Sequence, residues 1–200
     1  RVLDIGANVG LYTAVLANSV GRDGRVFAFE PMPAMADAAR TMVEWNRLSC
    51  VEVHQMALGE TDGIVNMAVP AFNFGDSRVS DRGSIPVQVR RGDSLLANLP
   101  SAQLIKIDVQ GYELPALRGL EQLLLRSPGV RIVFEYWPRG MELAGYSADQ
   151  LTAYMIRMDF DLFRIGPGSR LRPLPWGQIQ RHLVSRPWGE CQNFVAANRA

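Results

Sequence analysis

The first thirty residues contain the pattern that most restricts how this chain can fold. A short apolar run ends near Asp4, a glycine-bearing turn extends from Gly6 to Gly10, and a helical pattern begins at Leu11. A second apolar run ends at Glu30. This order predicts a strand, a tight turn, a helix and a second strand with a carboxylate at its tip. Such an arrangement suits an adenosine ligand, because the carboxylate can accept hydrogen bonds from both ribose hydroxyls.

The composition of the turn distinguishes between adenosine ligands. Dinucleotide-binding turns read Gly-x-Gly-x-x-Gly, and their second glycine lets the backbone approach a pyrophosphate. This chain has Gly6, Asn8 and Gly10 instead, so a side chain stands where a pyrophosphate needs none. Asn tolerates left-handed backbone angles, and its amide can meet the amino and carboxylate ends of S-adenosylmethionine. The turn therefore favours a methyl donor over NAD.

The bulk properties are those of an ordinary globular protein. The 200 residues suit one domain, 1–200, and the chain starts at Arg1 inside a predicted strand, so we expect that an N-terminal part is missing. With no apolar run of ~18 residues and no visible signal peptide, we expect a cytoplasmic protein without a membrane partner. A net charge of +1 does not indicate nucleic acid. Cys50 and Cys191 match no metal-binding spacing, so we expect reduced thiols and no metal.

Apolar runs and helical spacing alternate along the chain, which is typical of a parallel sheet covered on both faces. Residues 63–91 break this alternation with short β-like runs, and we interpret them as an inserted hairpin or flap. Ser147 to Gln150 form a capping-box pattern that predicts the start of a late helix. The other predicted strands are Val51–Ala57, Leu104–Val109, Val130–Tyr136, Leu162–Ile165 and Asn193–Ala197.

Ligands of open α/β sheets bind beyond the carboxyl ends of the strands. This rule predicts which side chains converge on one site. They are Asp4 and Gly6 after the first strand, Glu30 after the second, Met56 and Ala57 after the third, residues 108–113 after the fourth, and Glu135 and Tyr136 after the fifth.

Four motifs together resemble the FkbM-type methyltransferase family: Leu3–Gly10, Phe29–Pro31, Ala57–Gly59 and Lys106–Glu113. The resemblance extends from the start of the chain to about residue 136, and Gln110 stands where the family more often has Glu. It implies an α/β class I (Rossmann-like) fold with a doubly wound, mostly parallel seven-stranded sheet and an antiparallel closing strand. It also implies S-adenosylmethionine-dependent O-methylation of a hydroxyl on a sugar, polyketide or other small or carrier-linked metabolite.

The resemblance further implies roles for individual residues. The loop from Gly6 to Gly10 would hold the methionine end of the cofactor, and Glu30 would hold the ribose. Ala57 would lie against the adenine, and Asp108 would lie beside the reactive methyl group.

An alcohol acceptor must lose its proton, so a positioned base assists the reaction. Asp108 is the first candidate for this base, or for orienting the hydroxyl, and Glu113 and Glu135 are second candidates. His54 is a further possibility, although it lies within a strand. Each acid has a structural alternative: Asp4 can tie down its turn, while Asp108 can cap the following helix and Glu113 can be stabilised by that helix's dipole.

Lys106, the only lysine, shares a strand face with Asp108, and we expect it to pair with a neighbouring carboxylate because an unpaired buried ammonium is costly. The segment from Leu162 to Gly189 contains no acid. It is either a clamp for an anionic acceptor or a solvated surface. Its basic and aromatic residues are Arg164, Arg170, Arg172, Arg181, Arg186, Trp176 and Trp188.

Three rival functions stay open. A nucleic-acid methyltransferase is disfavoured, because the region after the fourth predicted strand lacks the Pro-Pro-aromatic turn and a Lys-Asp-Lys-Glu tetrad needs a second lysine. A NAD-dependent oxidoreductase is disfavoured by Asn8 and by the missing hydride-transfer residues. A non-catalytic nucleotide-binding module is the third.

Overall fold

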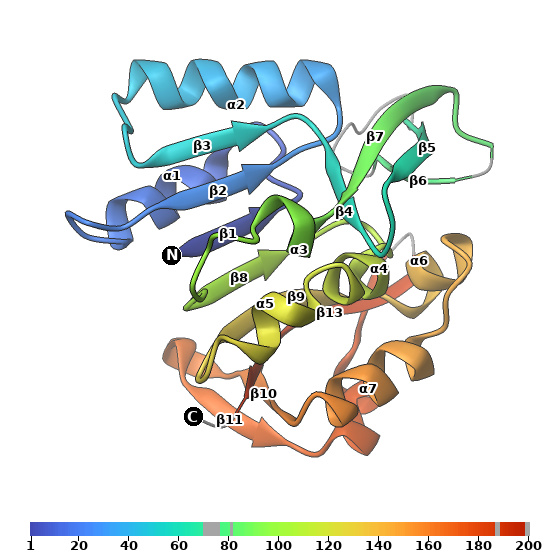
Figure 1. Cartoon of the computed structure of the whole chain (residues 1–200). Helices are drawn as coiled ribbons and strands as arrows, with labels where there is room; N and C mark the ends of the chain where they lie inside the picture. The colour runs from blue at the N-terminus through green and yellow to red at the C-terminus, as the bar shows by residue number, and fades with distance from the viewer. Residues whose placement is uncertain (70–76, 81, 187–188, 199–200) are drawn as a thin grey trace.

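The computed structural model describes residues 1–69, 77–80, 82–186 and 189–198. A large sheet forms the middle layer, helices cover both of its faces, and a second, smaller sheet lies beyond the carboxyl ends of its first strands (Figure 1). The helix α1 contacts α2, and α4 contacts α7. These two groups lie on opposite faces of the large sheet, as expected for a doubly wound fold.

The strands are β1 (Val2–Ile5), β2 (Val26–Phe29), β3 (Val51–His54), β4 (Ala57–Gly59), β5 (Gly63–Ala68), β6 (Arg78–Val79), β7 (Ile85–Arg91), β8 (Leu104–Ile107), β9 (Arg131–Tyr136), β10 (Phe160–Ile165), β11 (Leu171–Leu174), β12 (Val184–Arg186) and β13 (Gly189–Asn198). The helices are α1 (Leu11–Ser19), α2 (Pro33–Trp45), α3 (Gly92–Leu95), α4 (Glu113–Arg118), α5 (Glu121–Leu125), α6 (Pro138–Leu143), α7 (Ala148–Arg157), η2 (Pro167–Ser169) and η3 (Trp176–His182).

The large sheet has the strand order β11-β10-β13-β9-β8-β1-β2-β3, and β12 pairs with β13. Pairing is parallel from β3 to β9, while β13 runs antiparallel between β9 and β10. This confirms the predicted class I arrangement with its antiparallel closing strand. The predicted number of seven strands is too low, since the described sheet has nine. The extra edge strand β11 forms because a turn, closed by Gly166 N–H donating to Arg170 O, folds the chain back along β10.

The predicted strand Val51–Ala57 is two strands in different sheets. β3 ends at His54, whose carbonyl accepts a hydrogen bond from Met56 N, and Ala57 begins β4 of the second sheet. Ala57 therefore follows the turn after β3, and alternating apolar residues alone could not reveal this break.

The second sheet has the order β4-β7-β5-β6. Its antiparallel β5 and β7 confirm the hairpin interpretation of residues 63–91, of which 70–76 and 81 lie outside the described residues. The connection between β3 and β8 passes through this sheet and the short α3, and the sheet thereby reaches over the strand ends (Figure 1).

The core follows the alternation of the central strands. Ile105 and Ile107 of β8 are buried together with Ile132 and Phe134 of β9, while Lys106 on the opposite face is only partly buried. At the start of α7, the capping box predicted at Ser147 is present, with both of its hydrogen bonds formed. The strand tips of β1, β2 and β8 are thus held by a rigid interior.

Candidate functional site

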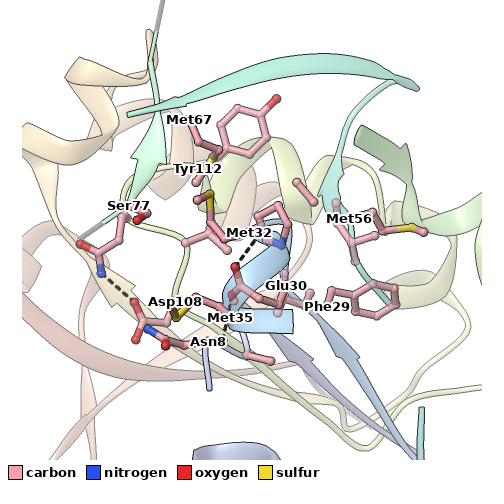
Figure 2. Close-up of a pocket in the computed structure, with 18 of the residues that line it drawn as sticks. Asn8, Phe29, Glu30, Met32, Met35, Met56, Met67, Ser77, Asp108 and Tyr112 are labelled. Carbon is pink, nitrogen blue, oxygen red and sulfur yellow. Dashed lines mark hydrogen bonds between the residues drawn. The ribbon is translucent and has the colours of Figure 1, made fainter. Parts of the chain in front are cut away.

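A cavity of about 280 Å³ opens at the carboxyl ends of β1, β2 and β8. Its walls come from the turn after β1, the tip of β2, the start of α2, the segment around β4, and the turn after β8. Met67, Ser77 and Val79, from the second sheet and its connection, also line it. Figure 2 shows Met67 and Ser77. The position agrees with the rule that ligands of such sheets bind beyond the strand ends.

The turn after β1 has the left-handed backbone that its sequence predicts. Gly6 and Asn8 have φ values of 79° and 50°, and both line the cavity. A Cβ atom on Gly6 would collide with the backbone carbonyl of Asp108, so only glycine fits between the two strand ends. The Asn8 side chain accepts a hydrogen bond from Val9 N at 2.7 Å. The turn thus contributes Gly6, Ala7, Asn8 and Val9 to the cavity lining.

Gly10 lies at the start of α1, where that helix packs closely against α2. It is absent from the cavity lining and is the N-cap residue of α1, with a φ of 89°. A Cβ atom there would meet Met42 and Ala39 of α2. Close packing of the two helices therefore explains this glycine, whereas its predicted contact with a cofactor stays a prediction.

Glu30 lies at the tip of β2 in the wall of the cavity, with 6% of its surface exposed. Its Oε2 accepts a hydrogen bond from Asn8 N at 2.8 Å, and its Oε1 accepts one from Met32 N at 2.9 Å. Burial raises the pKa of this carboxyl, while the two backbone donors and the Lys106 charge oppose the shift. Each carboxylate oxygen has further lone pairs for a hydroxyl donor. Figure 2 shows Glu30 between Asn8 and Met32.

Asp4 and Lys106 are neighbours in the register of β1 and β8, and they form a buried ion pair. Lys106 Nζ lies 3.1 Å from Asp4 Oδ1 and donates to Gly6 O at 2.6 Å. Asp4 Oδ2 accepts from the Thr13 hydroxyl at 2.6 Å. The expected pairing of Lys106 is confirmed, with Asp4 as its partner. Because Asp4 is fully buried and absent from the cavity lining, the geometry favours its structural alternative, and its predicted cofactor contact stays untested.

The apolar wall of the cavity is rich in thioethers. Four of the eight methionines of the chain line it: Met32, Met35, Met56 and Met67 (Figure 2). Methionine is polarisable and adapts to flat aromatic surfaces. Sequence reasoning placed Met56 at the site but missed the other three, because the four residues come from three separate segments and follow no motif. Ala57 lies in the same lining, next to Met56.

The turn after β8 supplies the polar side of the cavity. Asp108, Gln110 and Tyr112 line it, and Gln110 Nε2 donates to Asp108 Oδ1 at 2.9 Å. The same nitrogen also lies 3.3 Å from Glu135 Oε2. Burial, together with the neighbouring Tyr146, raises the pKa of the Tyr112 hydroxyl to about 12. Sequence reasoning expected residues 108–113 at the site, but it gave an individual role to Asp108 and none to Gln110 or Tyr112.

Glu113 is completely buried and is absent from the cavity lining. Its Oε1 accepts hydrogen bonds from Val109 N and Gly111 N, both at 3.2 Å. Burial raises its pKa to about 8, and the nearby Glu135 adds to the shift although the backbone donors oppose it. The geometry therefore favours Glu113 as a clamp on the turn that carries Asp108. Its predicted catalytic role stays untested.

Several other candidates lie away from the cavity. Glu135 is absent from the cavity lining, and its Oε2 lies 3.3 Å from Nε2 of Gln110, which does line the cavity. His54 is stacked on Phe29 with ring centroids 4.9 Å apart, and burial lowers its pKa.

The tail arginines lie on and around β10, β11 and β12, and none of them is in the cavity lining. Trp188 lies outside the described residues. Trp176 donates to Phe160 O and packs on the core. The positions of these arginines therefore give no support to the alternative in which the segment from Leu162 to Gly189 holds an anionic acceptor.

Neither a membrane span nor a metal centre is evident in the part of the chain that the structure describes. No helix there is long and apolar enough to cross a bilayer. The same residues contain no group of three or more His, Cys, Asp or Glu side chains that could hold a metal ion.

The sheet order and the cavity at its carboxyl edge are those of a class I methyltransferase. The family model described as "Methyltransferase FkbM domain" matches residues 4–162, and the chain belongs to this family of S-adenosylmethionine-dependent methyltransferases. The resemblance seen in the four motifs is thereby confirmed, and membership of this family disfavours the oxidoreductase alternative.

Two curated relatives have similar sequences. The chain is 25% identical over 145 residues to Methyltransferase 1 of Beauveria bassiana, covering 60% of this chain and 58% of that protein. It is 26% identical over 123 residues to the hexuronic acid methyltransferase AglP of Haloferax volcanii, covering 60% and 50%. The chain thus spans about half the length of the curated relatives it matches.

Solved structures support the fold. An FkbM methyltransferase of Methylobacillus flagellatus superposes with a TM-score of 0.62 at 20% identity, covering 98% of this chain and 43% of that one. The O-methyltransferase TomG of Streptomyces achromogenes, solved in complex with S-adenosylmethionine, gives 0.58 at 15% identity, covering 100% and 73%. At these identities the likeness concerns the fold alone.

Proposed function

We propose that the cavity binds S-adenosylmethionine and that the chain methylates a hydroxyl of a small or carrier-linked metabolite, with a sugar as the first acceptor class to test. The observation that carries the proposal is Glu30, a buried carboxylate in the cavity wall whose two oxygens are held by backbone N–H groups. The sugar class is supported by the name of the relative from Haloferax volcanii.

The lining residues fit this cofactor by their chemistry. A carboxylate suits the two ribose hydroxyls, since it is an acceptor for both. The thioether wall of Met32, Met35 and Met56 suits a flat purine. The turn from Gly6 to Asn8 and Lys106 line the same cavity, and they are proposed to hold the charged amino acid end.

The bound cofactor supplies a methyl group already activated by the sulfonium charge. The protein must align the acceptor oxygen with that group and exclude water. Asp108 would receive the proton that the acceptor hydroxyl loses when it is methylated. Asp108 is proposed for this role because it lines the cavity at the tip of β8.

Calorimetric titration with S-adenosylhomocysteine and, separately, with NAD tests the cofactor assignment. We expect binding of the first compound alone. E30A should weaken that binding about 10- to 100-fold, because a pair of charge-assisted hydrogen bonds is lost. E44A, which removes an exposed glutamate of α2, is the matched control and should bind as the parent does. Equal affinities of E30A and the parent would contradict the ribose assignment.

Methyl transfer is measured as production of S-adenosylhomocysteine with a panel of acceptors: a hexuronic acid, a neutral hexose, a phenol and an RNA oligonucleotide. We expect turnover with a sugar hydroxyl and a loss of about 10²- to 10⁴-fold in D108N, the range of a missing general base. Turnover with RNA alone would instead favour the nucleic-acid alternative.

A further inference from the structure

Two carboxylates meet one amide at the edge of the cavity. β8 and β9 pair in parallel with Ile107 opposite Phe134, so Asp108 and Glu135 follow at the same level on neighbouring strands. The side-chain nitrogen of Gln110 lies between them, 2.9 Å from Asp108 Oδ1 and 3.3 Å from Glu135 Oε2. Figure 2 shows the bond to Asp108 at the edge of the cavity.

The number of N–H donors on the Gln110 side chain matches the two carboxylate oxygens that surround it. A glutamine amide carries two N–H donors on one nitrogen, enough to serve two acceptors. Gln110 is committed to this position by its backbone, which has a left-handed φ of 54° that is uncommon for glutamine. A residue in such a conformation is retained only where its surroundings fix it. The two hydrogen bonds and the Glu113 clamp on Val109 and Gly111 provide that fixation.

We propose that Gln110 is a positioning residue for Asp108: its amide occupies Oδ1, separates the carboxylate from that of Glu135, and leaves Oδ2 for the acceptor hydroxyl. This inference rests on the proposed function, in which Asp108 receives the proton. Within the described part of the chain, Oδ2 accepts no hydrogen bond from another residue, whereas Oδ1 is taken by Gln110.

The other charged groups around Asp108 are already engaged. Lys106, two residues earlier on β8, pairs with Asp4 and Gly6 O. Glu113 clamps the turn from behind, and Glu30 is held by Asn8 N and Met32 N across the cavity. Gln110 therefore supplies the hydrogen bond that keeps Asp108 apart from Glu135. A carboxylate in its place would bring three acids together.

The test follows the Asp108 carboxyl by carbon-13 NMR as a function of pH, in protein without cofactor. Its resonance is identified by its disappearance in D108N. Hydrogen bonding to a carboxylate favours the ionised form, so Q110A should move the titration midpoint up by about one pH unit. Q110E should move it further, because a like charge is added. The matched control Q88E makes the same change on the exposed face of β7 and should leave the midpoint in place.

Midpoints that are equal in Q110A, Q110E and the parent, with native-like spectra throughout, would overturn the inference. Where Q110E does not fold, the Q110A midpoint alone decides. The acid limb of the pH–rate profile should follow the same order among the variants, which a purely structural glutamine would not cause. S-adenosylhomocysteine titrations of the same samples separate the two proposals. Binding together with unshifted midpoints defeats the role of Gln110 alone, whereas absent binding in the parent defeats the proposed function.

Discussion

Two turns of this molecule have the same construction but face the cavity differently. The β1 turn (residues 6–10) and the β8 turn (residues 108–113) each hold an amide residue in the left-handed region, Asn8 at a φ of 50° and Gln110 at 54°. Each also contains a glycine of positive φ. In each, a glutamate accepts two backbone hydrogen bonds, from Asn8 and Met32 in one case and from Val109 and Gly111 in the other.

The two glutamates differ in what surrounds them. Glu30 comes from the neighbouring strand β2, uses both oxygens and lies in the cavity wall. Glu113 belongs to the helix that its own turn begins, is sealed from solvent, and has its Oε2 without a hydrogen-bond partner among the described residues. The same pair of backbone hydrogen bonds therefore holds a cavity-lining carboxyl group at one turn and a fully buried carboxyl group at the other.

Lys106 links the two turns, and replacing it should have the largest effect on the stability of the fold. Lys106 of β8 holds both Gly6 O and Asp4. K106M leaves a fully buried carboxylate with Thr13 as its hydrogen-bond donor, and we expect a loss of about 3–5 kcal/mol in the free energy of unfolding, measured in urea. R157A, which breaks the exposed pair with Glu121, is the control and should cost less than about 1 kcal/mol.

The double variant D4N/K106M should recover part of the loss, since it removes the uncompensated charge. A loss below 1 kcal/mol in K106M would mean that Asp4 does not depend on this cation.

Replacing a glycine of each turn by alanine compares how much stability the two turns lose. G6A meets the Asp108 carbonyl and G111A meets the Gly140 carbonyl, both at positive φ, whereas G21A meets nothing within 4 Å at a φ of 74°. We expect about 2–4 kcal/mol of destabilisation for each of the first two and about 1–2 kcal/mol for G21A. Thermal unfolding monitored by circular dichroism measures all three. Equal losses at the three sites would show that backbone strain alone, and not the close approach, requires these glycines.

The pH dependence of stability should report the burial of Glu113. The pKa of Glu113 rises from 4.5 to about 8 on folding, so the folded protein keeps a proton that the unfolded chain releases. The stability contributed by this group is therefore present below about pH 4.5 and is lost as the pH rises toward 8. The variant E113Q has no ionisable group at this position, so it lacks this pH-dependent contribution to stability.

The difference in unfolding free energy between E113Q and the parent should grow in favour of E113Q by about 1 kcal/mol per pH unit across that window. Urea unfolding from pH 5 to 8 measures it. A difference that does not change with pH would contradict a protonated Glu113.

The β1 turn could be predicted from the sequence, and the surroundings of the β8 turn could not. Gly6, Asn8 and Glu30 form a local pattern whose spacing dictates its geometry. Glu113 begins α4, which packs against β4 and α7 from elsewhere in the chain. The split of Val51–Ala57 and the methionine wall likewise depend on the second sheet, whose strands pair across a connection that has no motif. The geometry of local motifs could therefore be predicted from the sequence, whereas contacts between distant segments could not.

The smallest effect should come from the side chain of Asn8. Its Oδ1 accepts from Val9 N, and its residue lines the cavity. Because glycine adopts a φ of 50° without strain, N8G should keep the fold while removing the amide. We expect S-adenosylhomocysteine to bind about fivefold more weakly, the equivalent of one hydrogen bond of about 1 kcal/mol. Calorimetry of N8G beside N18G, an exposed asparagine of α1, measures this difference. An unchanged affinity would mean that Asn8 serves only the backbone of its turn, and that the amides of the two turns differ in function as the two glutamates do.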